Sequence, residues 1–166
     1  MWQTAAALEI YFISGMEIMM SQLKCDFKVV GPVQTNCYFL SNTDTRECVI
    51  VDPGEEAGKI ADFIEKKELK PVAILLTHGH FDHIGAVDEI RNRYGIKVYA
   101  AAAEKETLEN PDINLSSQFG GGYTVKADEF LNDGQEIELL GEKVRCLLTP
   151  GHTKGGMCYY FTGSGI

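Results

Sequence analysis

The sequence lacks the features that would place it among secreted, membrane-spanning or repetitive proteins. No lysine or arginine precedes Lys24, so the basic region that opens a secretory signal is missing. The apolar stretch within residues 1–20 is interrupted by Glu9 and Glu17, which argues against a membrane span. No internal repeat or low-complexity tract is visible. We therefore expect a soluble, cytoplasmic protein.

Basic residues are also in short supply. The 166 residues include 15 lysines and arginines against 24 aspartates and glutamates, which gives a formal net charge of −9. This charge repels the phosphate backbone of nucleic acids and the surface of anionic membranes. We therefore expect a small-molecule substrate as the partner, and neither nucleic acid nor a membrane. The sequence carries no signal for the oligomeric state.

Cysteines spaced as C-x-x-C, a common zinc or redox motif, do not occur. The five cysteines are widely spread and odd in number: Cys25, Cys37, Cys48, Cys146 and Cys158. Such a set fits free thiols in a reducing compartment better than a disulfide framework.

The first 23 residues form an N-terminal extension ahead of the patterned sequence. This extension is either an extra helix or the product of a translation start assigned too far upstream, with Met16, Met19 and Met20 as alternative starts. We favour the second explanation. The chain length suits a single domain, which we place at residues 24–166.

Apolar runs and turn residues predict a mixture of strands and helices. Strands are expected over residues 27–30, 36–40, 48–51, 72–76, 97–100, 136–140, 143–148 and 157–162. Helices are expected over residues 55–67, 84–94 and 101–108, and a loop over residues 110–123. Antiparallel hairpins near both ends, with helices between them, predict the α+β class.

All four histidines fall in two short loops that contain glycine, and three of them lie within the string His78-Gly79-His80-Phe81-Asp82-His83. Imidazole is the commonest ligand for zinc and related ions, and aspartate adds a hard oxygen. His78 and His80 are two residues apart, so in an extended segment they point the same way. His152, beside Gly151 and after another predicted strand, is placed to complete a first cluster. The sequence therefore predicts a metal site.

Two aspartates can be explained by a structural role as well as by a functional one. Asp82 stands where the chain turns into a helix and could serve as the helix N-cap, as a metal ligand, or as both. Asp52, in Asp52-Pro53-Gly54, could simply end a strand in a turn, which is the commoner role of that sequence.

The H-x-H-x-D-H string followed by Pro150-Gly151-His152-Thr153 resembles the metallo-β-lactamase-fold hydrolase superfamily. Within it, the sequence is most similar to the glyoxalase II-like, hydroxyacylglutathione hydrolase-related group. Residues 34–38 (Gln-Thr-Asn-Cys-Tyr) and 51–54 (Val-Asp-Pro-Gly) support the resemblance. It implies a four-layer αββα sandwich of two sheets packed face to face with helices outside.

The resemblance also implies roles for individual residues. His78, His80 and His152 would hold a first metal ion, and Asp82 and His83 a second. Asp52 would steady a ligand histidine, and Asp82 would in addition be catalytic by orienting the attacking water. The implied cofactor is one or two Zn²⁺ ions, with Fe²⁺ or Mn²⁺ as alternatives. The implied chemistry is hydrolysis by a metal-bound hydroxide, which a bound divalent ion makes available near neutral pH.

The sequence departs from the family pattern after Thr153. The family has a bridging aspartate in a later Gly-Asp motif and a further histidine, but here no histidine follows His152 and no aspartate follows Asp133. We therefore expect a sandwich whose second half is incomplete, that is, a chain truncated at its C-terminus. The helical region with which glyoxalase II holds glutathione is not found either, so glutathione specificity is not supported.

Three functions follow from these observations. The first is a metal-dependent hydrolase of a thioester such as an acyl-glutathione-like compound. The second is an iron-dependent sulfur dioxygenase of the same fold, acting on a persulfide. The third is a non-catalytic truncated fragment.

Overall fold

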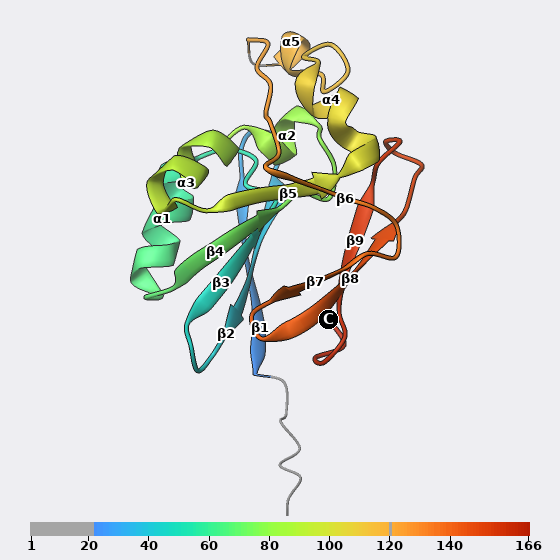
Figure 1. Ribbon diagram of the computed structural model, residues 1–166. Helices are drawn as coiled ribbons and strands as arrows, with labels where there is room; N and C mark the ends of the chain where they lie inside the picture. The colour runs from blue at the N-terminus through green and yellow to red at the C-terminus, as the bar shows by residue number, and fades with distance from the viewer. Residues whose placement is uncertain (1–21, 120) are drawn as a thin grey trace, which may run out of the picture.

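The computed structural model describes residues 22–119 and 121–166 (Figure 1). The expected N-terminal extension and its alternative start methionines lie outside the described residues, apart from Gln22 and Leu23. Within the described part of the chain, no helix is long and apolar enough to span a bilayer. All five cysteines are free, and Cys37, Cys48 and Cys146 are buried.

The larger sheet has six strands in the order β1-β2-β3-β4-β5-β6. Their bounds are β1 Leu23–Val30, β2 Thr35–Asn42, β3 Glu47–Val51, β4 Lys70–Leu75, β5 Lys97–Ala101 and β6 Glu129–Leu131. The first three strands pair antiparallel, whereas β3 to β6 pair parallel. The parallel strands all point the same way, so the segments that follow them emerge at one edge of the sheet.

The smaller sheet is an antiparallel meander in the order β7-β8-β9. Its strands are β7 Glu136–Leu139, β8 Glu142–Leu148 and β9 Met157–Phe161. The helices are α1 Ala57–Lys66, α2 Phe81–Ile84, α3 Val87–Tyr94, the 3₁₀ helix η1 Ala102–Glu104, α4 Lys105–Glu109 and α5 Ser116–Phe119.

The six-stranded sheet is buried on both faces. Successive strand residues point to opposite sides, so Phe39 packs toward α1 and α3 while Leu40 packs toward the smaller sheet. The helix side adds Ile60, Ile64 and Ile90 to one core, and the smaller sheet contributes Leu140, Val144 and Phe161 to the other. Because β4 lies between these two cores, its sequence is a continuous apolar run without alternation.

These layers confirm the predicted α+β class and the face-to-face sheets. The described residues form three layers of the expected four-layer sandwich, namely helices, the larger sheet and the smaller sheet (Figure 1). Helices α1 and α3 cover the outer face of the larger sheet, and none of the described helices covers the outer face of β7-β8-β9.

The predicted helix over residues 84–94 corresponds to α3, which begins only at Val87, and the chain between α2 and α3 is bonded elsewhere. The Ala86 amide donates to the carbonyl of Pro53 instead of continuing α2. At Gly85, an added Cβ would lie 2.3 Å from the carbonyl oxygen of Gly54. The helix is therefore interrupted by contact with a distant turn, which helical periodicity does not report.

Three other segments differ from the prediction. The segment 101–108 divides into η1 and α4, and the predicted loop 110–123 contains the four-residue helix α5. Strand β6 was not predicted, because three residues are too few to show an alternating pattern.

Candidate metal centre

The histidine and aspartate side chains of interest follow strands that end at one edge of the molecule. Asp52 directly follows β3, and Thr77 and His78 come just after β4, its parallel neighbour. His152 lies in the loop between β8 and β9 of the smaller sheet. The Met157 amide donates to the Thr77 carbonyl at 2.9 Å, so the start of β9 is attached to the end of the β4 segment. Both histidine loops are thereby brought to the same edge.

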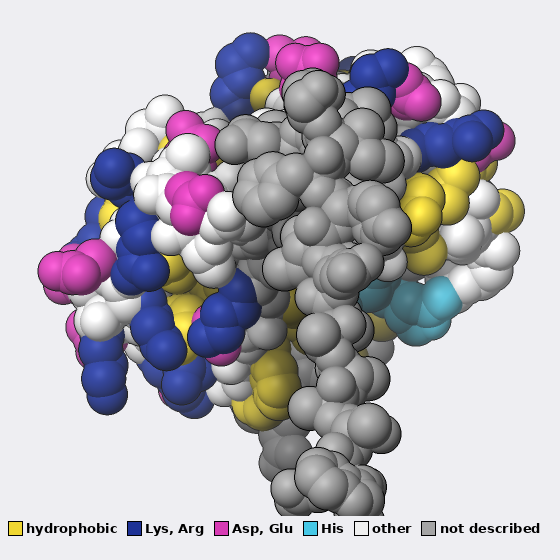
Figure 2. Space-filling view, turned by 90° about the horizontal axis from the view of Figure 1, so that it is seen from below, with side chains coloured by type: hydrophobic (Ala, Val, Ile, Leu, Met, Phe, Trp, Pro, Cys, Tyr) yellow, Lys and Arg dark blue, Asp and Glu magenta, His cyan; other side chains and the backbone are white. Residues whose placement is uncertain are grey.

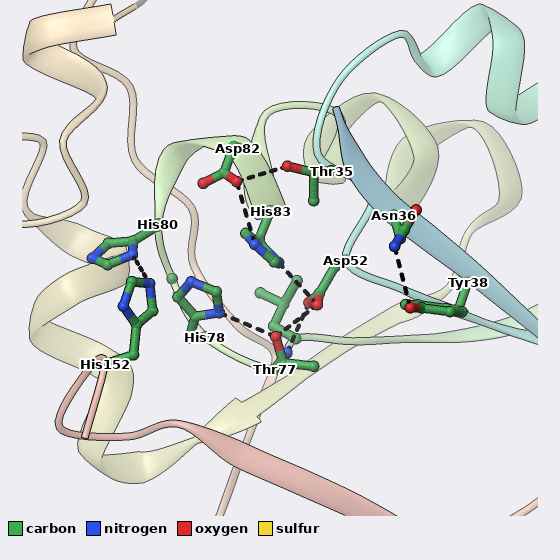
Figure 3. Close-up of polar contacts among 12 residues, drawn as sticks. Thr35, Asn36, Tyr38, Asp52, Thr77, His78, His80, Asp82, His83 and His152 are labelled. Atoms are coloured by element: carbon green, nitrogen blue, oxygen red, sulfur yellow. Dashed lines mark hydrogen bonds and ion pairs between the residues drawn. The ribbon is translucent and has the colours of Figure 1, made fainter. Parts of the chain in front are cut away.

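Three histidines form a compact group (Figure 3). Potential ligand atoms of His78, His80 and His152 all lie within 4.8 Å of one another. His80 Nδ1 and His152 Nε2 face each other at 2.9 Å. His78 lies deepest, and His152 is exposed. Histidine side chains reach the surface beside hydrophobic ones in the face shown in Figure 2, so the group is open to solvent on one side.

The deepest histidine presents a nitrogen without a partner. His78 Nε2 is buried and, within the described residues, has no hydrogen-bond partner. The Thr77 hydroxyl donates to Asp52 Oδ2 at 2.6 Å and lies 3.1 Å from His78 Nδ1. Because the hydroxyl proton is used by Asp52, its lone pair can accept Nδ1–H, which leaves Nε2 of His78 as a bare lone pair. An unpartnered buried nitrogen is costly unless something binds it, so these residues fit a metal ion.

Asp82 and His83 form a second group beside the first. The Asp82 carboxylate accepts a hydrogen bond from the Thr35 hydroxyl at 2.6 Å and lies 3.3 Å from His83 Nε2. The N-cap position of α2 is occupied by His80, and its side chain makes no capping bond. Asp82 lies in the first turn of α2, so the N-cap alternative is not what the structure shows.

Asp52 connects the two groups. Its carboxylate accepts the Thr77 amide at 2.8 Å through Oδ1, and its Oδ2 approaches His83 Nδ1 to 2.9 Å. The latter contact is an ion pair rather than a well-aligned hydrogen bond. Asp52 also follows the last residue of β3 directly and has a positive φ of 54°. One side chain thus contacts the residue before His78 and contacts His83 directly, as outer partners of metal ligands do.

The electrostatics divide the histidines into two kinds. Burial, reinforced by His83, His80 and His152, lowers the pKa of His78 to about 3. Burial and the adjacent His152 also lower the pKa of His80. Both are therefore neutral at pH 7, which is the form that binds metals.

His83 has the opposite charge state. Burial acts to lower its pKa, but the carboxylates of Asp52 and Asp82 outweigh burial and raise that pKa to about 9. Burial likewise acts to raise the pKa of Asp82, but hydrogen bonds with His83 and Thr35 hold it well below its usual range. His83 is therefore a cation between two carboxylates, and any metal ion bound by its imidazole would have to displace a proton.

We expect the metal-free chain to lose stability as the pH rises from about 6.5 to about 9. The folded chain holds the His83 proton over this interval, whereas the unfolded chain has released it, so folding is favoured below the interval and less so above it. The loss should be on the order of 3 kcal/mol. Urea unfolding in chelator at several pH values measures it. His83→Gln should flatten the decline, and a wild-type free energy that rises across the interval would contradict the assignment.

The segment that was predicted as a loop over residues 110–123 lies against the string from His78 to His83. The Phe81 amide donates to the Asn114 carbonyl at 2.8 Å, and the Tyr123 hydroxyl donates to the Phe81 carbonyl at 2.8 Å. The Phe119 ring stacks on Phe81 at 4.6 Å between centroids. Because its hydroxyl is engaged in this way, Tyr123 serves to hold the loop in place.

A cavity of about 420 Å³ opens beside the histidine group. Its lining combines His80 and His152 with Ile113, Pro150 and Lys154, among others. A space of this size next to the histidines is able to admit a small organic molecule.

Sequence reasoning missed Thr35 and Thr77 as parts of the site. Both hydroxyls bind a carboxylate that contacts His83, Thr35 on Asp82 and Thr77 on Asp52. Thr35 lies in the 34–38 stretch and Thr77 lies next to His78. Their positions in or beside these motifs are the sequence feature that could have indicated a place in the site.

The comparisons agree with this geometry. Residues 30–166 match the Metallo-beta-lactamase superfamily. The chain is 44% identical over 133 residues to the protein named probable metallo-hydrolase YqgX of Bacillus subtilis (strain 168), covering 79% of this chain and 62% of that protein. It is 34% identical over 142 residues to the probable polyketide biosynthesis zinc-dependent hydrolase PksB of the same strain, covering 81% and 57%. The chain thus spans about three fifths of the length of these relatives.

Solved structures show the same fold. BLEG-1, a B3 metallo-β-lactamase, superposes with a TM-score of 0.77 at 40% identity, over 83% of this chain and 67% of that one. TTHA1623, solved in a di-iron-bound form, superposes with a TM-score of 0.67 at 29% identity, over 82% and 66%. The metal of this chain is thus not decided between zinc and iron by its relatives. With its two facing sheets and its histidine loops, the chain belongs to the metallo-β-lactamase superfamily.

Proposed function

We propose that this chain carries the metal-binding part of a hydrolase that cleaves a small thioester, such as an acyl-glutathione-like compound. The observation that carries the proposal is the group of His78, His80 and His152, in which the buried Nε2 of His78 has no partner within the described residues. Relatives named as metallo-hydrolases support the hydrolytic class. The thioester substrate rests on the resemblance to the glyoxalase II-like group.

The residues of the site would have separate roles in this function. His78, His80 and His152 would hold the ion, with His78 and His80 supplying neutral imidazoles because their pKa values are lowered. A divalent ion held there supplies Lewis-acid activation of water and of the acyl carbonyl. The Asp82 carboxylate, ionised and fixed by Thr35, provides an oriented acceptor for a proton beside the histidines. Asp82 and His83 would in addition receive a second ion.

The cavity beside His80 and His152 would hold the acyl compound. Ile113 and Pro150 provide apolar surface in it. Lys154, the only lysine or arginine among the described residues of the lining, is mostly exposed and paired with Glu106 at 3.3 Å. The cavity thus has little free positive charge, which favours an acyl group of low charge over a strongly anionic one.

The test is release of free thiol from an acyl-glutathione thioester. We expect the chain to accelerate this release when loaded with Zn²⁺ or Fe²⁺, and to lose the acceleration with chelator. A His152→Ala variant should be inactive with either metal. Absence of any acceleration by a folded, metal-loaded chain would contradict the proposal. Because BLEG-1 is called a β-lactamase, a chromogenic β-lactam should be tested in the same assay. If the chain cleaves the β-lactam and not the thioester, the proposed substrate class changes from thioester to amide.

An iron-dependent persulfide dioxygenase is the second candidate. Two observations favour it: a similar protein was solved with iron, and the single compact ligand group within the described residues is made of three histidines. Oxygen uptake with a persulfide by the iron-loaded chain, without thiol release from the thioester, would select this function over hydrolysis.

A further inference from the structure

Glu104 is a completely buried acidic residue placed between the two histidine loops. It ends the 3₁₀ helix η1 after β5, and its relative exposure is 0%. Among the described residues, Asp52 is the only other buried acidic residue. Burying a carboxylate is costly unless its oxygens receive hydrogen bonds, so its partners indicate what it is there for.

The Glu104 carboxylate accepts hydrogen bonds from both loops. Its Oε1 accepts the Gly79 amide at 3.1 Å, and Gly79 stands between His78 and His80. Its Oε2 accepts the Thr153 hydroxyl at 3.0 Å and the Gly155 amide at 2.7 Å, in the segment that follows His152. The backbone amides can only donate, and the hydroxyl is oriented to donate as well. The two carboxylate oxygens thus accept all three of these donors.

The loop backbones are shaped around this carboxylate. A Cβ at Gly155 would lie 2.4 Å from the Glu104 amide nitrogen and 2.5 Å from its Oε2. A Cβ at Gly79 would meet Leu108 of α4 at 3.0 Å. The loop after His152 thus approaches Glu104 closely because glycine occupies position 155, whereas a side chain at position 79 would need Leu108 to shift by a few tenths of an ångström.

We propose that Glu104 is a positioning residue that sets the separation between the His78–His80 loop and the His152 loop, and so organises the three-histidine group for metal binding. The proposal rests on the proposed function only in taking these three histidines as the metal ligands. The two loops are 72 residues apart along the chain, measured from His80 to His152. A single carboxylate that accepts from both holds His152 beside His80 before any ion arrives, which lowers the ordering cost of binding.

The experiment measures Zn²⁺ affinity by competition with a chromogenic chelator, and the visible absorption of the Co²⁺-substituted chain. Glu104→Gln keeps the shape but turns an amide NH₂ toward a donor. We expect it to weaken Zn²⁺ binding about 10- to 100-fold and to alter the Co²⁺ spectrum. Glu109→Gln makes the same charge change at an exposed position of α4 and should leave both readouts as in the wild type.

Two further measurements separate positioning from simple stability. Urea unfolding of the metal-free variants shows how much fold is lost. If Glu104→Gln lowers the unfolding free energy while Zn²⁺ affinity and the Co²⁺ spectrum stay unchanged, the role is structural and the proposal is overturned. If Glu104→Gln does not fold, Thr153→Ala provides the test, because it removes one of the three hydrogen bonds to the Glu104 carboxylate. It should weaken Zn²⁺ binding severalfold, and unchanged affinity would overturn the proposal.

These results are independent of the substrate. A chain that binds Zn²⁺ through the histidines but hydrolyses no thioester would contradict the proposed function and leave the role of Glu104 intact. Conversely, His152→Ala could lose Zn²⁺ affinity while Glu104→Gln and Thr153→Ala keep it. That result would support the three-histidine metal site and overturn the role of Glu104.

Discussion

His78→Ala should reduce the affinity of the chain for Zn²⁺ by more than about 100-fold, since loss of an outer partner alone typically costs 10- to 100-fold. His78 Nε2 is buried, and in the described residues it has no other partner. Its lowered pKa keeps it neutral, so no proton competes with the ion at neutral pH. Removing this nitrogen leaves His80 and His152, of which His152 is exposed. Two imidazoles are fewer than the three protein ligands usual for zinc.

The matched control is His83→Gln. His83 contacts His78 at 4.0 Å between ring centroids, but it belongs to the group with Asp52 and Asp82. We expect His83→Gln to keep one ion bound through the three histidines with an affinity near that of the wild type. Isothermal titration with Zn²⁺ distinguishes the variants by both stoichiometry and affinity. Equal losses in the two variants would contradict the division of ligands between two positions.

Gly54→Ala should destabilise the chain by about 3 kcal/mol or more, at or beyond the upper end of typical overpacking. A Cβ at this position would lie 1.7 Å from the carbonyl oxygen of Asp82. The carbonyl oxygen belongs to the backbone and the backbone fixes the position of a Cβ, so no side-chain rotation can relieve the contact. The turn after β3 and helix α2 would have to separate. This separation would also move Asp82 and His83 away from Asp52.

Gly58→Ala is the control for this prediction. Gly58 lies in α1, and an added Cβ there meets nothing within 4 Å. Because alanine favours a helix over glycine, this variant should be neutral or stabilised by up to about 1 kcal/mol. Urea unfolding of both metal-free variants measures the difference. A Gly54→Ala variant within about 0.5 kcal/mol of the wild type, the range of ordinary surface substitutions, would show that the close approach of these backbones is not required.

The fold class and the chemistry of the site could be predicted from the sequence, because both depend on local patterns. The alternation and apolar runs of β2, β3, β4 and β8 reflect which neighbours each residue faces, and that periodicity is visible within a few residues. The string from His78 to His83 places four polar side chains together by spacing alone. The sequence therefore determined an α+β fold and a metal-binding character at the ends of strands.

The tertiary structure decided which side chains meet and what state they are in. The hydrogen bonds from Thr35 to Asp82, from Gly155 to Glu104 and between His80 and His152 join residues 47, 51 and 72 positions apart. No local pattern encodes such pairs. The opposite pKa shifts of His78 and His83 depend on the burial and carboxylates that these contacts create. Local periodicity is a property of neighbours in the chain, whereas a site is a property of neighbours in space, and only packing of the two sheets brings the two loops together.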